Sequence, residues 1–183
     1  MFKFNVNLTD DDYLEYNKFW NFRSHYGKGQ IISMRIMLAV MVCVFIVLTL
    51  VINGFSTGTL IGVITLVAFL VVMELLLKKY ITFTLKANLK NLKKKGKVAY
   101  SPNSTMEFYE ETFTEATDDV KTEQKYSSVE RVSVVRGKAI YLHVNSLASY
   151  ILPLSAFDNK EQFDSFVEFL NSKINIVDIY ELQ

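Results

Sequence analysis

Two long apolar runs constrain the fold of this chain more than any other feature of its sequence. Residues 36–52 contain no charged side chain, and residues 59–77 contain one, Glu74. At roughly 1.5 Å per helical residue, each run covers most of a bilayer hydrocarbon core of about 30 Å. Because lipid offers the backbone no hydrogen-bond partners, each run is expected to cross as a helix. The sequence therefore predicts a membrane protein with a soluble remainder.

The segment between the runs, residues 53–58, is short and uncharged, which is typical of a tight turn between antiparallel helices. Residues 36–77 are thus expected to form a two-helix transmembrane hairpin. Lysines and arginines flank both outer ends of this hairpin, and such residues stay on the cytoplasmic side. We expect a multi-pass protein of the bacterial inner membrane with both termini in the cytoplasm.

Four residues of the hairpin suggest helix-packing or ionic roles. Gly54, Gly58 and Gly62 are spaced by four, so they are predicted to let the two helices pack closely. Glu74 could mark an ion or proton site, since a carboxylate in hydrocarbon is costly. Lys78 lies one helical turn later, however, and an interfacial ion pair between the two is the favoured interpretation.

Residues 78–97 form a basic segment with no acidic side chain. Its apolar residues recur at helical spacing, which predicts an amphipathic continuation of the second membrane helix, ending near Gly96. The lysines are expected to anchor the chain at an anionic lipid surface, each contributing on the order of 1 kcal/mol. A nucleic-acid partner is not expected, because no arginine is interleaved with the lysines and the segment is tethered at the bilayer. The lysines are Lys78, Lys79, Lys86, Lys90, Lys93, Lys94, Lys95 and Lys97.

Residues 1–35 are expected to form an N-terminal segment with a short strand and an amphipathic helix. Residues 2–6 alternate as a strand does, and Thr9 with Asp12 forms a capping-box pattern that predicts a helix over about 10–26. The aromatic side chains of this helix suit either a membrane interface or packing against the C-terminal domain. The sequence leaves both alternatives open.

Residues 98–183 show short alternating segments followed by a helix that Asp158 is predicted to cap, with Glu161 three residues later. This pattern is typical of an antiparallel sheet closed by a C-terminal helix. We predict an α+β membrane protein in which the hairpin is joined to a cytoplasmic, pleckstrin-homology-like domain. Strands are expected at 105–110, 112–117, 120–126, 129–135, 139–144 and 149–152, with a seventh around Val98.

Three stretches of the sequence resemble the YcxB-like family of bacterial membrane proteins. They are residues 8–14, residues 128–132 leading to Tyr141 and Leu142, and residues 150–157. The resemblance implies a membrane hairpin followed by a pleckstrin-homology-like domain, and it implies no established activity. The chain departs from the family pattern at two places. Leu154 stands where a basic residue follows the proline, and Tyr126 stands where a tryptophan often precedes the central strand.

Charge separates the domain from the basic segment. Residues 98–183 contain seven basic and fourteen acidic side chains, a net charge of −7. An anionic bilayer repels such a domain, so lipid head-group binding by the domain is disfavoured. A basic protein surface, or the lysines of residues 78–97, would attract it over roughly 8 Å at physiological salt.

The sequence offers no catalytic or metal-binding motif. His25 and His143 lack partners at ligand spacing, and His143 is expected on the wet face of its strand. The carboxylates between residues 107 and 123 lack the spacing of a calcium loop and are expected to form a solvated acidic rim. We therefore expect a protein that is not an enzyme and that has no cofactor and no metal.

The leading functional hypothesis is a membrane protein that presents its cytoplasmic domain for protein interaction or self-association. The expected contact face comprises Tyr109, Tyr141 and His143. An alternative is an immunity-type protein that protects the cell from a membrane-active toxin. A more remote alternative, a small transporter or channel subunit, depends on Glu74 alone.

Overall fold

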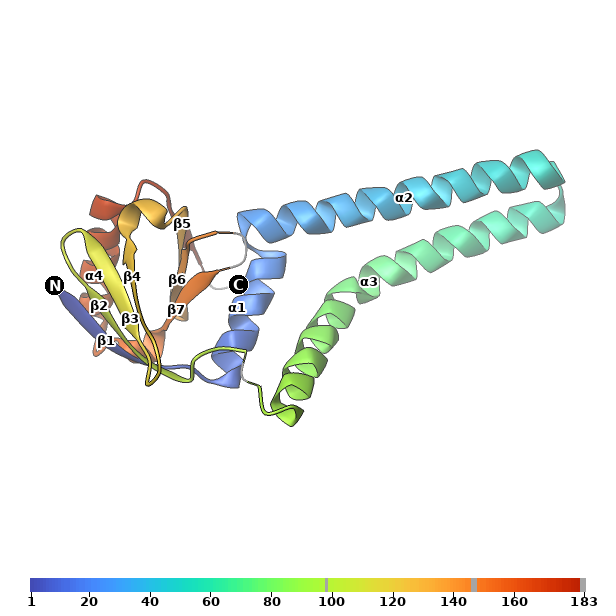
Figure 1. Ribbon diagram of the computed structural model, residues 1–183. Helices are drawn as coiled ribbons and strands as arrows, with labels where there is room; N and C mark the ends of the chain where they lie inside the picture. Colours follow the sequence, from blue (N-terminus) through green and yellow to red (C-terminus); the bar gives the residue numbers. More distant parts are fainter. Residues whose placement is uncertain (98, 146–147, 182–183) are drawn as a thin grey trace. The chain divides into compact units, whose positions relative to one another are not determined.

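The structure, a computed structural model, describes residues 1–97, 99–145 and 148–181 (Figure 1). The chain divides into two compact units. The first comprises Met1–Tyr16 and Lys97–Gln183, and the second comprises Asn17–Gly96. Helix α1 (Asp10–Phe22) runs from the first unit into the second. Thr9 and Asp12 form the predicted capping box, with Asp12 accepting from the Thr9 amide at 2.9 Å and Thr9 Oγ1 accepting from the Asp12 amide at 3.2 Å.

The second unit is a helical hairpin of α2 (His25–Asn53) and α3 (Thr57–Lys94), both long and apolar enough to cross a membrane. Ser24 caps α2 and Ser56 caps α3, each through its side-chain oxygen. Gly54 ends α2 with φ of +63°, a conformation that glycine adopts without steric cost. Helix α2 therefore begins eleven residues before the apolar run, because Ser24 supplies a cap there.

The predicted close packing at the hairpin glycines is wrong for the two glycines that lie in α3. A methyl group added to Gly62 would meet no atom within 4 Å, and one added to Gly58 would meet only Ser56 Oγ, at 3.8 Å. Glycine brings helices together only where it faces the neighbouring helix. Gly54 serves the turn instead, where its positive φ is required.

The basic segment continues α3 to Lys94, as its helical spacing predicts. All eight lysines are exposed, while Leu89 is only 5% exposed and Ile81, Leu85 and Leu92 are partly buried. The two faces of this part of α3 therefore differ in polarity, and the helix is amphipathic here. Contact of the lysines with anionic lipid stays a prediction.

Glu74 pairs with Arg35 of α2, with 3.0 Å between Arg35 Nε and Glu74 Oε2. The predicted ion pair with Lys78 is wrong. An antiparallel hairpin places residues that are equally distant from the turn opposite each other, so Glu74 faces Arg35 across the helix pair. The pair therefore joins α2 to α3 near the open end of the hairpin.

Among its described residues, the first unit contains two four-stranded sheets. Sheet one has the order β1-β2-β3-β4 and is antiparallel throughout. Sheet two has the order β7-β6-β5-β8, in which β8 lies parallel to β5 and the other described pairs are antiparallel. The strands are β1 (Phe2–Asn7), β2 (Asn103–Phe108), β3 (Thr112–Ala116), β4 (Lys121–Lys125), β5 (Arg131–Val135), β6 (Ala139–His143), β7 (Ser149–Pro153) and β8 (Val177–Tyr180).

Six of these strands, β2 to β7, confirm the predicted ones, with small shifts at their ends. The seventh strand expected around Val98 falls on a position outside the described residues. Helix α4 (Lys160–Lys173) is the predicted C-terminal helix, but Asn159 caps it in place of Asp158, accepting from the Gln162 amide at 2.8 Å. Strand β8 follows α4 and was not predicted.

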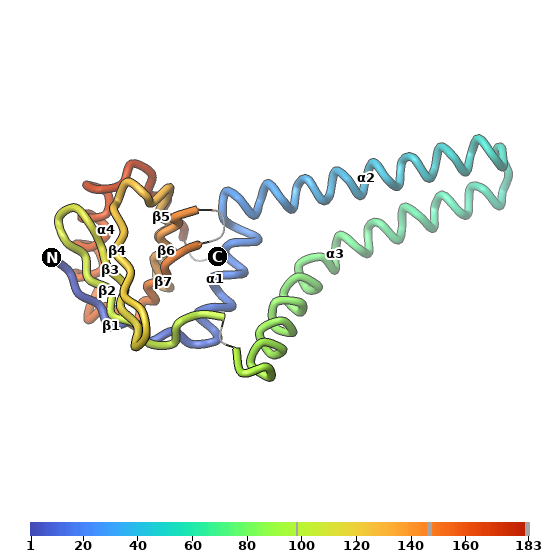
Figure 2. Tube along the Cα trace, viewed as in Figure 1, coloured from blue at the N-terminus to red at the C-terminus, as the bar shows by residue number. Residues whose placement is uncertain are grey.

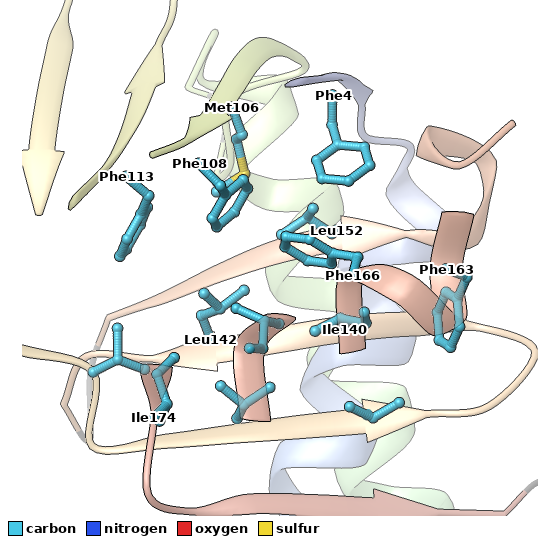
Figure 3. Packing of buried hydrophobic residues seen from close by; sticks show 14 of the residues in the cluster. Phe4, Met106, Phe108, Phe113, Ile140, Leu142, Leu152, Phe163, Phe166 and Ile174 are labelled. Carbon is cyan, nitrogen blue, oxygen red and sulfur yellow. The ribbon is translucent and has the colours of Figure 1, made fainter. Parts of the chain in front are cut away.

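The core of the first unit is one cluster of buried side chains from both sheets and α4 (Figure 3). Phe166 of α4 is fully buried, with its ring centroid 4.8 Å from that of Phe4 and 4.7 Å from that of Phe108. Ile140, Leu142 and Leu152 of the second sheet belong to the same cluster. The amphipathic helix thus closes both sheets, as the apolar stripe of α4 predicts.

The N-terminal strand completes this core rather than forming a segment of its own. Figure 2 shows the blue strand β1 beside β2, about a hundred residues later in the chain. Asn7 pairs with Asn103 and Phe2 with Phe108, and Phe4 is 1% exposed. Residues 1–35 therefore do not form the separate segment that was predicted, since residues 1–16 belong to the first unit. The alternation of residues 2–6 predicts a strand but not the distant strand with which it pairs.

The pair between Arg35 and Glu74 should stabilise the hairpin measurably. In a double-mutant cycle of R35Q and E74Q, we expect a coupling free energy of about 1 kcal/mol, since both side chains are partly exposed. Titration of the detergent-solubilised protein with sodium dodecyl sulfate, followed by Trp20 fluorescence, measures it. K78Q is the matched control and should leave the transition unchanged. Coupling of Glu74 with Lys78 instead of Arg35 would contradict the observed pair.

Candidate interaction sites

A groove of about 580 Å³ lies on the first unit between the turn joining β5 to β6 and the start of α4. Phe157 and Phe163, 9% and 6% exposed, supply its most buried apolar surface, while Leu154 is 42% exposed. Pro153 ends β7, and a 3-10 turn over Leu154–Ala156 follows. The Leu154 amide donates to the Lys138 carbonyl at 2.7 Å, which holds this turn against the start of β6.

Charged side chains also line the groove. Arg136 forms an ion pair with Glu181, the residue after β8, with 3.0 Å between Nη1 and Oε1. Within the described ranges, Lys160 makes no ion pair, and Asp164 lies one turn further along α4. The groove thus combines an apolar surface with two cations and one carboxylate, although residues 98–183 are acidic overall.

The outer face of the second sheet carries a chain of hydrogen bonds that is covered by α1. Tyr16 donates from its hydroxyl to Ser149 Oγ at 2.9 Å. Ser149 Oγ lies 2.8 Å from His143 Nδ1, and Ser133 Oγ lies 3.0 Å from His143 Nε2. The ring of Tyr16 also packs edge-on against Tyr141, with centroids 5.1 Å apart.

The predicted contact face of Tyr109, Tyr141 and His143 is therefore wrong. Tyr141 is 2% exposed and His143 is 1% exposed, because the first half of α1 covers the face of β6 that alternation assigned to solvent. Tyr109 follows β2 of the other sheet, where its hydroxyl donates to Glu107 at 2.5 Å. The structure does not bring these three side chains together on one surface.

The pKa of His143 is lowered from 6.5 to about 4, chiefly by burial and also by the nearby Arg131 guanidinium, while Asp178 and Glu130 oppose the change. The imidazole is consequently neutral near pH 7 and can accept one hydrogen bond while donating another. A side chain that is 1% exposed cannot contact a ligand in solution. His143 therefore has a structural role on this face.

The acidic side chains of the first sheet are partly neutralised by lysines. Glu107 pairs with Lys3 at 2.8 Å and Glu110 pairs with Lys173. These contacts lower the pKa of each carboxyl below its usual range. Among the residues that the structure describes, no group of three histidines, cysteines or carboxylates is placed to hold a metal ion.

Lys121 and Lys125 lie on β4, an edge strand of the first sheet, and both are exposed. Charged side chains at an edge oppose unwanted pairing with another strand. The second unit also carries an apolar groove of about 360 Å³ on α3, which includes the exposed Tyr80 and Phe83 beside Lys79. Such aromatic residues beside lysine are typical of a membrane interface.

The groove at α4 was not predicted from the sequence. Leu154 stood out only as a departure from a family pattern, and Arg136 and Lys160 only as two of the seven basic residues of the domain. The available signal was the apolar, proline-containing stretch 151–157 directly before a helix cap. That stretch alone could not show that the turn between β5 and β6 lies beside it.

The family model described as YcxB-like protein matches residues 108–170. The matched range includes two of the three stretches that carry the family resemblance, 128–142 and 150–157, and the walls of the groove at α4. It confirms the resemblance over this part of the chain. Neither the curated proteins nor the solved structures contain a match to the chain.

The stability of the face around His143 should fall in mild acid. Between pH 6.5 and about 4 the unfolded imidazole binds a proton that the folded one does not, so stability decreases as pH falls through this window. The full loss amounts to about 3 kcal/mol. Amide hydrogen exchange of β6 between pH 7 and 4.5, corrected for intrinsic exchange, measures the larger part of this loss.

H143Q is the matched variant for this measurement, because glutamine does not titrate yet keeps a donor and an acceptor. The stability of the variant should depend less steeply on pH over the same window, since the carboxyl groups contribute equally in both proteins. Identical slopes in the two proteins would show that His143 does not titrate on opening.

Proposed function

We propose that this chain, a YcxB-like protein by the match of residues 108–170, is a non-enzymatic inner-membrane protein that presents a cytoplasmic domain to a protein partner. The groove at α4 is the observation that carries the proposal, because it joins exposed apolar surface to charged groups on a folded domain. Leu154, 42% exposed beside the nearly buried Phe157 and Phe163, is the expected centre of contact.

The apolar side chains of α2 and α3 support insertion in a membrane. Many of them are at least half exposed within the hairpin, including Ile36, Phe45 and Ile64 at 59%, 54% and 67%. Exposing so much contiguous apolar surface to water is unfavourable, whereas a bilayer removes it from water. The exposed lysines at the end of α3 favour the cytoplasm for that end.

The arrangement of the first unit supports the pleckstrin-homology-like interpretation. Strands β1 to β4 form one antiparallel sheet, β5 to β7 form an antiparallel part of the other, and α4 closes both. Strand β8 is an addition to that plan. This architecture hosts many functions, so the choice of a protein partner depends on the groove and not on the fold.

Charge favours a protein over a bilayer as the partner of the domain. A lipid surface acts on the whole domain, whose net charge over residues 98–183 is −7, and anionic lipid would repel it. A protein segment that enters the groove is influenced mainly by charges within roughly 8 Å. Arg136 and Lys160 line the groove and are therefore cations at that distance.

Site-specific photo-crosslinking in the native membrane tests the proposal. The full chain is expressed with benzoylphenylalanine in place of Leu154 and, as a control, in place of Val120, which is 58% exposed on a turn of the other sheet. We expect a discrete crosslinked protein at position 154 and none at position 120. Mass spectrometry then distinguishes a cytoplasmic partner from a second copy of this chain.

A second variant shows whether the captured protein depends on the groove. L154D places a carboxylate on the apolar surface and should lower recovery of the untagged partner at least tenfold in a reciprocal purification. V120D is the matched control and should leave recovery unchanged. Equal crosslinking at both positions, or equal loss with both aspartates, would contradict a partner site at the groove.

A further inference from the structure

We propose that the groove at α4 binds an extended peptide segment in which a bulky apolar side chain lies next to a carboxylate. This inference rests on the proposed function, and it names the chemistry of the partner segment. The groove volume of about 580 Å³ lies within the range of specific ligand pockets, roughly 300 to 1,000 Å³. An apolar side chain would remove Leu154 and the exposed edges of Phe157 and Phe163 from water.

Arg136 already binds a carboxylate of the chain itself at the groove. Glu181, directly after β8, pairs with Arg136, and the Arg136 amide donates to the Tyr180 carbonyl at 3.0 Å. The side chains of Arg136 and Glu181 are 60% and 70% exposed. Such an exposed pair contributes little stability, so a carboxylate from a partner can replace Glu181.

Lys160 provides a second cation on the same groove. It is exposed, lies in the first turn of α4, and makes no ion pair with any described residue. Lys138, also near the turn between β5 and β6, is instead held by Glu15 at 2.5 Å. Arg136 and Lys160 are therefore the two groups that distinguish a carboxylate from a neutral amide in the bound segment.

Asp164 limits the number of acidic groups that the segment can carry. It lines the same groove from the second turn of α4 and would repel a second carboxylate at that end. The same repulsion acts on a lipid phosphate, and the net charge of −7 over residues 98–183 opposes approach to an anionic bilayer. The groove consequently fits a segment with a single acidic side chain better than a membrane surface.

Fluorescence anisotropy with defined peptides tests this inference on the full chain in a neutral detergent. The probes are labelled hexapeptides that carry Leu, Phe or Trp next to Glu, each compared with the same peptide carrying Gln. We expect the best Glu peptide to bind at least tenfold more tightly than its Gln counterpart. E181Q, which releases Arg136 from its internal partner, should tighten binding of the Glu peptide two- to threefold.

K160E and R136E should each remove the preference for Glu over Gln, whereas K121E, the same charge change on the far edge of the first sheet, should preserve it. Equal binding of the Glu and Gln peptides would overturn the inference of a carboxylate. If L154D then abolished binding of both peptides, the groove would still be a binding site and the proposed function would stand.

A soluble short-chain phosphatidylglycerol is the competing probe. Two results together would overturn the inference in favour of lipid. The lipid would bind the wild type but not K160E or R136E, and no peptide would bind at concentrations up to about 1 mM. The absence of binding by every probe to both the wild type and E181Q would also overturn it. Crosslinking at position 154 would still test the proposed function separately.

Discussion

The pairing of β1 with β2 fixes where the chain leaves the first unit and where it returns to that unit. Residues 2–7 and 103–108 form adjacent strands although the whole helical hairpin lies between them in the chain. Because Asn7 must lie opposite Asn103, the chain has to leave the first unit and return to the same place. If α2 and α3 cross a bilayer, they must therefore enter and leave it on the same side. The pairing of β1 with β2 thus requires both ends of the hairpin to lie on one side of the bilayer, whichever side that is.

Helix α1 extends this constraint from the strand to the second sheet. Its first half brings Tyr16 onto β6 and β7, where the hydrogen bonds through Ser149 and His143 are shielded from solvent. A neutral imidazole that both donates and accepts completes this network without burying a charge. The same helix runs into the unit that contains the hairpin. The covered face thus has a structural role, which leaves the groove at α4 as the surface for partner binding in the proposed function.

Local patterns predicted the elements that local physics determines. The apolar runs, the capping box at Thr9 and six strands were evident because periodicity and capping depend on neighbouring residues. Residues far away in sequence determine the partner of β1, the partner of Glu74 and the burial of His143. Alternation therefore placed His143 in solvent, and i,i+4 spacing paired Glu74 with the wrong residue. Strand β8 escaped prediction because four residues after a helix carry little periodic signal. The groove was missed because Arg136 and Lys160 are distant in sequence and line one groove only in the folded domain.

Cysteine crosslinking tests whether β1 and β2 are paired in the native membrane. In a C43A background, N5C and T105C occupy directly paired positions of β1 and β2. We expect a short bis-maleimide to join them within one chain in native membranes. The same reagent should not join N5C to E123C, which lies on the strand at the opposite edge of the sheet. Failure of the paired cysteines to crosslink, with both still reactive toward a single maleimide, would contradict the pairing of β1 with β2 and the placement of both ends of the hairpin on one side of the bilayer.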